Sequence, residues 1–170
     1  RPNLGVYSGG TCTPAQGIKI YVYNNPGHPC KTNNYLPLNL RILDDNPSIQ
    51  TVVISSHWRP VLDGKTLNAE EGGNGLRVAS IYPGESGLSA KDLIYNGLRR
   101  TILELLNRKV DILFVRDTPD FDVDIRDLCA KRFSGFDASD CSLSRKSFDL
   151  RKVREDRLVE RLKLDFPSLS

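Results

Sequence analysis

Short apolar runs alternate along this chain with longer segments in which apolar residues recur at helical spacing. Gln50 to Ser55 contains a β-branched run, Val52 to Ile54, that predicts a strand buried on both faces, and Val110 to Val115 predicts the next buried strand. Leu4 to Tyr7 predicts another short strand, and Ile18 to Tyr23 alternates with a period of two, which predicts an extra strand or ribbon. This alternation is typical of an open, mostly parallel α/β sheet.

Helical spacing predicts three helices between and after the strands. Asn34 to Asp45 carries leucines along one face of the first. Ser89 and Asp92 resemble a capping box, which predicts the start of a second helix that ends near Arg108. Leu150 to Leu164 predicts a third helix, charged and lying on the surface.

The remaining stretches are polar or rich in turn residues. Val61 to Gly87 is interpreted mostly as a surface insertion, with a short strand at Leu76 to Tyr82, and Phe121 to Ser147 is interpreted as irregular. With 170 residues, of which 39% are apolar, residues 1–170 are expected to form a single domain around one core. The chain begins at Arg1 and contains no Met, so we expect it to be part of a longer protein.

Composition narrows the range of functions. The net charge is only +3, from 24 basic and 21 acidic residues without long runs of one sign, and it does not indicate a nucleic-acid partner. The apolar runs are all far shorter than the ~20 residues that a membrane-spanning helix requires. Four cysteines fall into two local pairs, Cys12 with Cys30 and Cys129 with Cys141, and predict disulfides in an oxidising compartment. The absence of a Cys-x-x-Cys motif or Cys/His cluster argues against zinc.

Four motifs follow the predicted strands in order. They are Asn3 to Thr11, Val52 to Arg59 with its Ser-Ser-His-Trp-Arg end, Asp117 to Asp120, and the loop from Cys129 to Cys141. In this order they resemble the SGNH (GDSL-type) domains fused to bacterial membrane acyltransferases that O-acetylate surface polysaccharides. The resemblance implies a three-layer α/β/α sandwich with a mostly parallel, flavodoxin-like sheet, incomplete at both ends in this chain.

The resemblance also implies a reaction and its setting. A Ser acyl-enzyme would move acetyl groups onto a surface polysaccharide of the lipopolysaccharide O-antigen type, at the periplasmic face of the bacterial inner membrane. The domain itself would need no cofactor, because the donor, derived from acetyl-CoA, would arrive through a transmembrane acyltransferase domain. The family's nucleophile lies in a Gly-Asp-Ser block and its base in an Asp-x-x-His block. Neither block occurs in this sequence, so the first strand and the final catalytic segment are expected outside it.

The family motifs select four candidate site residues. Gly9 matches the Gly whose backbone N–H serves the oxyanion hole, and Arg59 stands where ordinary SGNH hydrolases place an Asn. Both follow predicted strands, so we expect them to meet at the carboxyl edge of the sheet as donors to an oxyanion. His57 and Trp58 are candidate substrate-binding residues, with Trp58 walling the site or stacking on a sugar. In the alternative, Arg59 pairs with a surface carboxylate and Trp58 fills the core.

Other features imitate active sites. Gly84-Glu85-Ser86-Gly87 resembles a nucleophile motif, but Leu88 follows it and no buried strand leads into Ser86. A dyad of Ser56 and His57 would need an unusual turn, because adjacent positions on an extended chain point to opposite faces.

The acidic side chains after the last predicted strand could bind a divalent cation, although a solvated loop is favoured. They are Asp117, Asp120, Asp122 and Asp124.

Two other functions stay open at this level. Ester hydrolysis would use the same fold, because transfer and hydrolysis differ only in the acceptor that reaches the acyl-enzyme. A non-catalytic carbohydrate-binding module would instead use the rings of Trp58, Tyr82 and Tyr95 as stacking faces for sugars.

Overall fold

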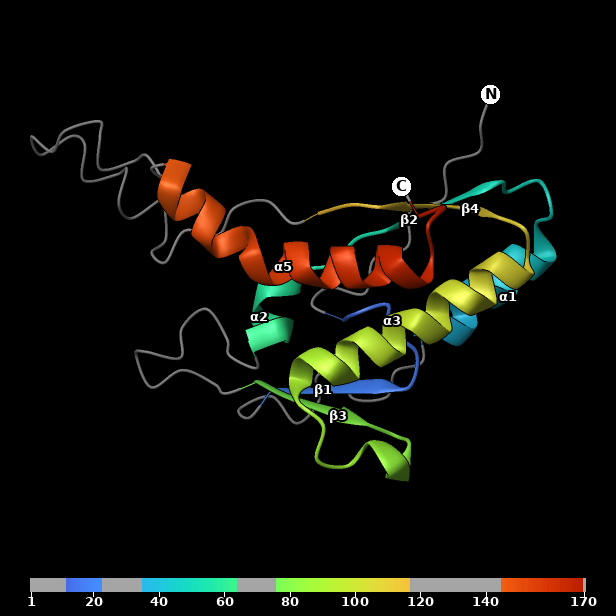
Figure 1. Ribbon diagram of the computed structural model, residues 1–170. Coiled ribbons are helices and arrows are strands. Elements are labelled where there is room, and N and C mark those ends of the chain that lie inside the picture. Colours follow the sequence, from blue (N-terminus) through green and yellow to red (C-terminus); the bar gives the residue numbers. More distant parts are fainter. Residues whose placement is uncertain (1–11, 23–34, 64–75, 117–144, 170) are drawn as a thin grey trace, which may run out of the picture.

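The computed structural model describes residues 12–22, 35–63, 76–116 and 145–169 of the chain. Strands and helices alternate through these segments (Figure 1). The elements are, in order, β1 (Ile18–Val22), α1 (Tyr35–Asp45), β2 (Thr51–Ile54), α2 (Trp58–Asp63), β3 (Leu76–Ser80), the 3-10 helix η3 (Pro83–Glu85), α3 (Ala90–Asn107), β4 (Asp111–Phe114) and α5 (Arg145–Asp165).

The strands of the described segments form two separate pairs. β1 and β3 form an antiparallel ribbon, in which Ile18 lies opposite Ser80. β2 and β4 are parallel and in register, and the ladder continues where the Val115 N–H donates to the Ile54 carbonyl at 2.8 Å. The predicted ribbon and the strands predicted at Gln50 to Ser55 and Val110 to Val115 are thus confirmed. The single, mostly parallel sheet is not found among the described residues, since half of their strands pair antiparallel.

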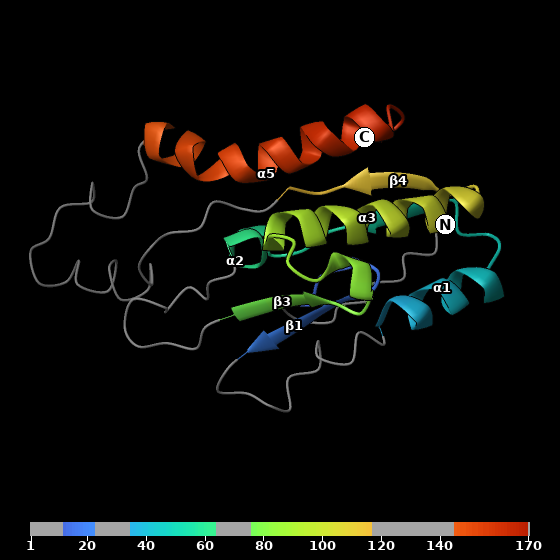
Figure 2. The same ribbon diagram turned by 60° about the horizontal axis from the view of Figure 1, so that its bottom comes forward.

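Helix α3 lies between the ribbon and the parallel pair in both views (Figures 1 and 2). It also packs against α2 and α5. Its start is the predicted cap: the Ser89 hydroxyl oxygen accepts the Asp92 N–H at 3.2 Å, and the Ser89 hydroxyl donates to the Asp92 carboxylate at 2.7 Å. Its apolar face forms the centre of the core. The residues with no exposed surface there are Ile94, Leu98 and Ile102.

A glycine in the middle of α3 lets the ribbon approach closely. A Cβ at Gly97 would lie 2.6 Å from Ile18 Cγ1 and 2.8 Å from Ala15 Cβ. With no side chain in the way, the Gln16 N–H reaches the Gly97 carbonyl at 3.0 Å. One turn further, the Thr101 hydroxyl donates to the Pro14 carbonyl at 2.6 Å. The chain before β1 is therefore anchored along one side of α3.

Three expectations about burial are corrected in part by the structure. Val53 and Leu113 are 50% and 43% exposed, so the parallel pair is covered on one face only, where Ile54 and Phe114 pack into the core. Val61 begins the expected surface insertion, yet it is buried within α2, together with Leu62. The helix predicted to lie on the surface begins earlier, at Arg145, and part of it is buried in the core. Its buried side chains include Leu158, Val159 and Leu162.

Other expectations fall on residues that the structure does not describe. These are the strand at Leu4 to Tyr7, residues 64–75 of the surface insertion expected at Val61 to Gly87, and most of the irregular stretch from Phe121 to Ser147. Among the described residues, the helix predicted at Asn34 to Asp45 is confirmed as α1, and the short strand at Leu76 to Tyr82 is confirmed as β3. None of the helices in the described segments is long and apolar enough to cross a membrane.

Candidate functional site

Parallel strands end at a common edge, and ligands of open α/β sheets bind beyond these ends. Here β2 is followed by Ser55, Ser56 and His57, and β4 is followed by Val115 and Arg116. We call four of these residues the carboxyl edge, namely Ser56, His57, Val115 and Arg116; Ser55 is exposed and is not included. The parallel register places the ends of β2 and β4 side by side, since Ile54 lies opposite Phe114.

Trp58 fixes the loop of the carboxyl edge to the neighbouring strand. Its ring is 0% exposed and stacks on Phe114, with 4.8 Å between ring centroids and 20° between the planes. Its indole N–H donates to the Val115 carbonyl at 3.2 Å. A fully covered ring offers no face to a sugar, so the core alternative fits Trp58 and the stacking role does not.

The other candidate residues are placed only in part. His57 is half-buried and directly precedes α2. Arg59 lies in the first turn of α2, which puts its backbone beside the carboxyl edge, while its side chain is outside what the structure describes. Gly9 also lies outside the described residues. The proximity of Gly9 and Arg59 at the carboxyl edge therefore stays a prediction.

Ser56 is a functional candidate that sequence patterns alone did not favour. Its Oγ atom is buried, yet within the described structure it has no hydrogen-bond partner. A buried hydroxyl without a partner is uncommon, because leaving such a group unpaired costs about 1–3 kcal/mol. No sequence signal distinguishes it from Ser55, which is exposed.

An ion pair joins the carboxyl edge to helix α5. Arg116 Nη1 lies 2.7 Å from Asp156 Oδ1, and both side chains are partly exposed. This pair was not expected from the sequence, because it links residues 40 positions apart. It places a guanidinium and a carboxylate at the end of β4.

The tyrosines proposed as stacking faces are already engaged. The Arg100 guanidinium lies 4.4 Å from the centre of the Tyr82 ring. Tyr95 is buried, with the Arg161 guanidinium 3.6 Å from its ring centre, and its hydroxyl donates to Asp165. Burial raises the pKa of the Tyr95 hydroxyl, and the bond to Asp165 adds to this. These contacts favour a structural role for both rings.

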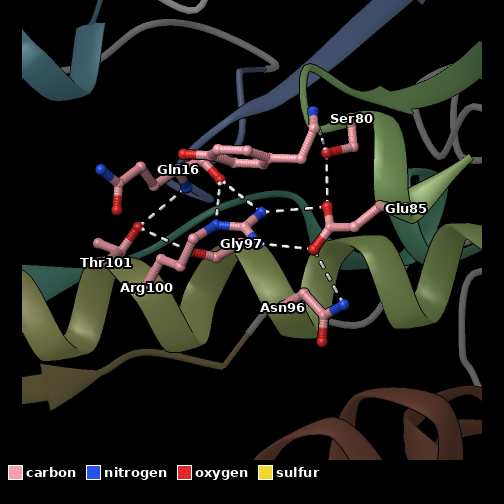
Figure 3. Close-up of polar contacts among 8 residues, drawn as sticks. Gln16, Ser80, Glu85, Asn96, Gly97, Arg100 and Thr101 are labelled. Carbon is pink, nitrogen blue, oxygen red and sulfur yellow. Dashed lines mark hydrogen bonds and ion pairs between the residues drawn. The ribbon is translucent and has the colours of Figure 1, made fainter.

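Glu85, the residue before Ser86, belongs to a structural network (Figure 3). Glu85 accepts hydrogen bonds from Arg100 at 2.6 Å, from Asn96 at 3.1 Å and from the Ser80 hydroxyl. The Arg100 hydrogen bond holds the pKa of the Glu85 carboxyl below its ordinary value. Arg100 also donates to the Gln16 carbonyl at 3.0 Å. Because these groups hold one another, the network ties β3 and the residues before β1 to α3.

Ser86 and the acidic loop gain no support as reactive sites. Ser86 is exposed and caps η3, where its N–H bonds the Pro83 carbonyl at 3.2 Å, and no strand leads directly into it. The loop aspartates Asp117 to Asp124 are outside the described residues. Within the described segments, no group of three or more His, Cys, Asp or Glu side chains could hold a metal ion.

Of the four cysteines, only Cys12 is in a described segment. It is disulfide-bonded and packs against the core, and its partner lies outside the described residues. The pairing of Cys12 with Cys30, and that of Cys129 with Cys141, stay predictions.

The comparison with known families covers almost the whole chain. Residues 3–168 match the family described as SGNH domain (fused to AT3 domains). No curated protein and no solved structure matches the chain. The family has an α/β/α fold, which agrees with helices packed on small sheets. The chain therefore belongs to the SGNH domains of the type fused to AT3 (acyltransferase 3) domains.

Proposed function

We propose that this domain works in a membrane-associated O-acyltransferase that moves acetyl groups onto a surface polysaccharide of the lipopolysaccharide O-antigen type. The observation that carries the proposal is the family match over residues 3–168, which links the domain to AT3 acyltransferases. Such a fusion suggests membrane association outside the cytoplasm, and we assign the domain to the periplasmic face of the bacterial inner membrane. The disulfide at Cys12 supports an oxidising compartment.

The reaction has two balanced steps. A Ser in the longer protein attacks the acetyl carbonyl of the donor, a His takes the Ser proton, and the donor leaves with that proton. The acceptor sugar hydroxyl then attacks the acyl-enzyme and loses its proton to the His. The bond between the acetyl carbon and the Ser oxygen breaks, and the His gives its proton to the Ser oxygen, which forms the sugar ester and restores both residues. The residues of this chain would contribute by holding the substrate and stabilising the oxyanion of each step.

The oxyanion donors of this chain belong at the carboxyl edge. We place the Gly9 N–H and the Arg59 guanidinium there, because each follows a strand or predicted strand of the family pattern. Arg59 suits the role, since its guanidinium is always charged and offers several N–H donors. His57 is a half-buried residue of the same edge, and we assign it to contact with the acceptor.

Deletion of the gene tests the proposal and separates it from its alternatives. We expect the O-acetyl signals in proton NMR spectra of the purified surface polysaccharide to disappear in the deletion strain and to return on complementation. An esterase on the same fold would give the opposite change, more O-acetyl after deletion. Unchanged O-acetylation would contradict both enzymatic functions and favour a carbohydrate-binding module.

A further inference from the structure

The Ser56 hydroxyl is buried without a protein partner at the place where a substrate is expected. Its Oγ atom has no hydrogen-bond partner in the described structure. Thr13 Oγ1 and Asn39 Oδ1 share this property. Asn39 lies within α1, and Thr13 stands next to the disulfide-bonded Cys12. Of the three residues, Ser56 is the one that directly extends a parallel strand at its carboxyl end, two positions after Ile54.

The position of Ser56 is held from both sides. On one side, Ile54 is in the ladder with β4, where its carbonyl accepts the Val115 N–H at 2.8 Å. On the other side, Trp58 is packed in the core and bonded to the Val115 carbonyl at 3.2 Å. A hydroxyl on a backbone that is anchored on both sides needs little rearrangement of the chain to meet a ligand, as a donor that stabilises a transition state requires.

We infer that Ser56 is a further oxyanion donor, resting on the proposed acyl transfer. When the nucleophile attacks the acetyl carbonyl carbon, the electron pair of the C=O bond moves to oxygen. The Ser56 O–H donates a hydrogen bond to this oxyanion and keeps its proton. When the C=O bond forms again, the leaving group departs and Ser56 is unchanged. The ligand of Ser56 is thus the acyl oxygen of an ester or thioester, and no covalent bond to Ser56 forms.

The test compares Ser56→Ala and Ser55→Ala in the full-length protein. Ser55 is exposed and adjacent, so its substitution makes the same chemical change outside the proposed contact. The readouts are kcat and KM for acetyl transfer, the thermal midpoint, and peptide mapping of the trapped acyl-enzyme. We expect Ser56→Ala to lower kcat at least tenfold with KM within about twofold, because removing one oxyanion donor typically costs a factor of 10²–10³.

The thermal midpoint separates this role from a structural one. Since the hydroxyl has no protein partner to lose, Ser56→Ala should melt at or above the wild-type temperature. Ser55→Ala should match the wild type in every readout. Unchanged kcat, a change in KM alone, a fall in kcat that follows a lower thermal midpoint, or an acetyl group mapped to Ser56 would each overturn the inference. Absence of transfer by the wild type would instead overturn the proposed function.

Discussion

Gly97 is the residue on which the contact between the ribbon and α3 most depends. A methyl group there would meet Ile18 and Ala15, both buried, and would lie 3.2 Å from the Ala15 carbonyl carbon. We expect Gly97→Ala to lower the free energy of unfolding by about 1–3 kcal/mol, since overpacking of a fixed core outweighs the better helix propensity of Ala. Urea unfolding of the purified domain measures this.

Gly84→Ala is the matched control. Gly84 is exposed in η3, and a Cβ there would have no described atom within 4 Å. Its substitution should change the free energy of unfolding by less than about 0.5 kcal/mol. Equal effects at the two glycines would contradict the packing argument.

Arg59 gives a prediction about activity. In the full-length protein, Arg59→Ala should lower acetyl transfer at least tenfold and leave the melting temperature nearly unchanged, because the proposed contact is made in the transition state. Arg41→Ala, at an exposed Arg of α1, serves as the control and should keep full activity. Full activity of Arg59→Ala would show that Arg59 is not an oxyanion donor. It would favour the alternative, in which Arg59 pairs with a surface carboxylate.

At the scale of elements, the Glu85 network should make docking of the ribbon sensitive to acid. The Arg100 hydrogen bond lowers the pKa of Glu85 from 4.5, so the folded state favours the carboxylate. This stabilisation is complete above about pH 4.5 and is lost as the pH falls through the lower pKa of the folded state. Glu85→Gln should cost about 1–3 kcal/mol at pH 7 and clearly less at pH 3.

Glu104→Gln provides the comparison. Glu104 also pairs with an arginine, but its side chain is 41% exposed, against 13% for Glu85. Its loss should cost less than about 1 kcal/mol at pH 7. Urea unfolding curves at both pH values measure the differences. The same loss for Glu85→Gln at pH 7 and pH 3 would show that its charge is not involved.

Elements with a long or regular pattern could be predicted from the sequence. The cap at Ser89 and the helical spacing of Ile94, Leu98 and Ile102 define α3, and short apolar runs define β2 and β4. Helix α2 could not be predicted, because six residues are too few to reveal a helical period. Helix α2 is stabilised by the packing of its buried side chains, Trp58, Val61 and Leu62, in the core.

The sequence supplied the place proposed for the site but not its detail. The order of motifs led to the end of β2, which follows from the general behaviour of parallel sheets. It left open whether Trp58 faces a sugar or the core, since an aromatic ring suits both. It also gave no reason to choose Ser56 over Ser55, because that difference depends on how the loop packs between Ile54 and α2.

For the whole molecule, the disulfides are the first point to test. Non-reducing peptide mapping should find Cys12 joined to Cys30 and Cys129 joined to Cys141. Each closed loop should stabilise the fold by roughly 3 kcal/mol in the chain-entropy model, so reduction should lower the urea midpoint. Four free thiols in the protein isolated from its native compartment would overturn both pairings and the extracytoplasmic location.

The central claim is that acyl transfer takes place at the carboxyl edge of β2 and β4. The most direct measurement is a structure of the full-length protein after reaction with a serine-reactive phosphonate, which mimics the tetrahedral intermediate. We predict that the phosphonyl oxygen lies about 3 Å from Ser56 Oγ, between the ends of the two strands. An adduct at the opposite ends of these strands, beside Val110 and Asp111, would contradict the account.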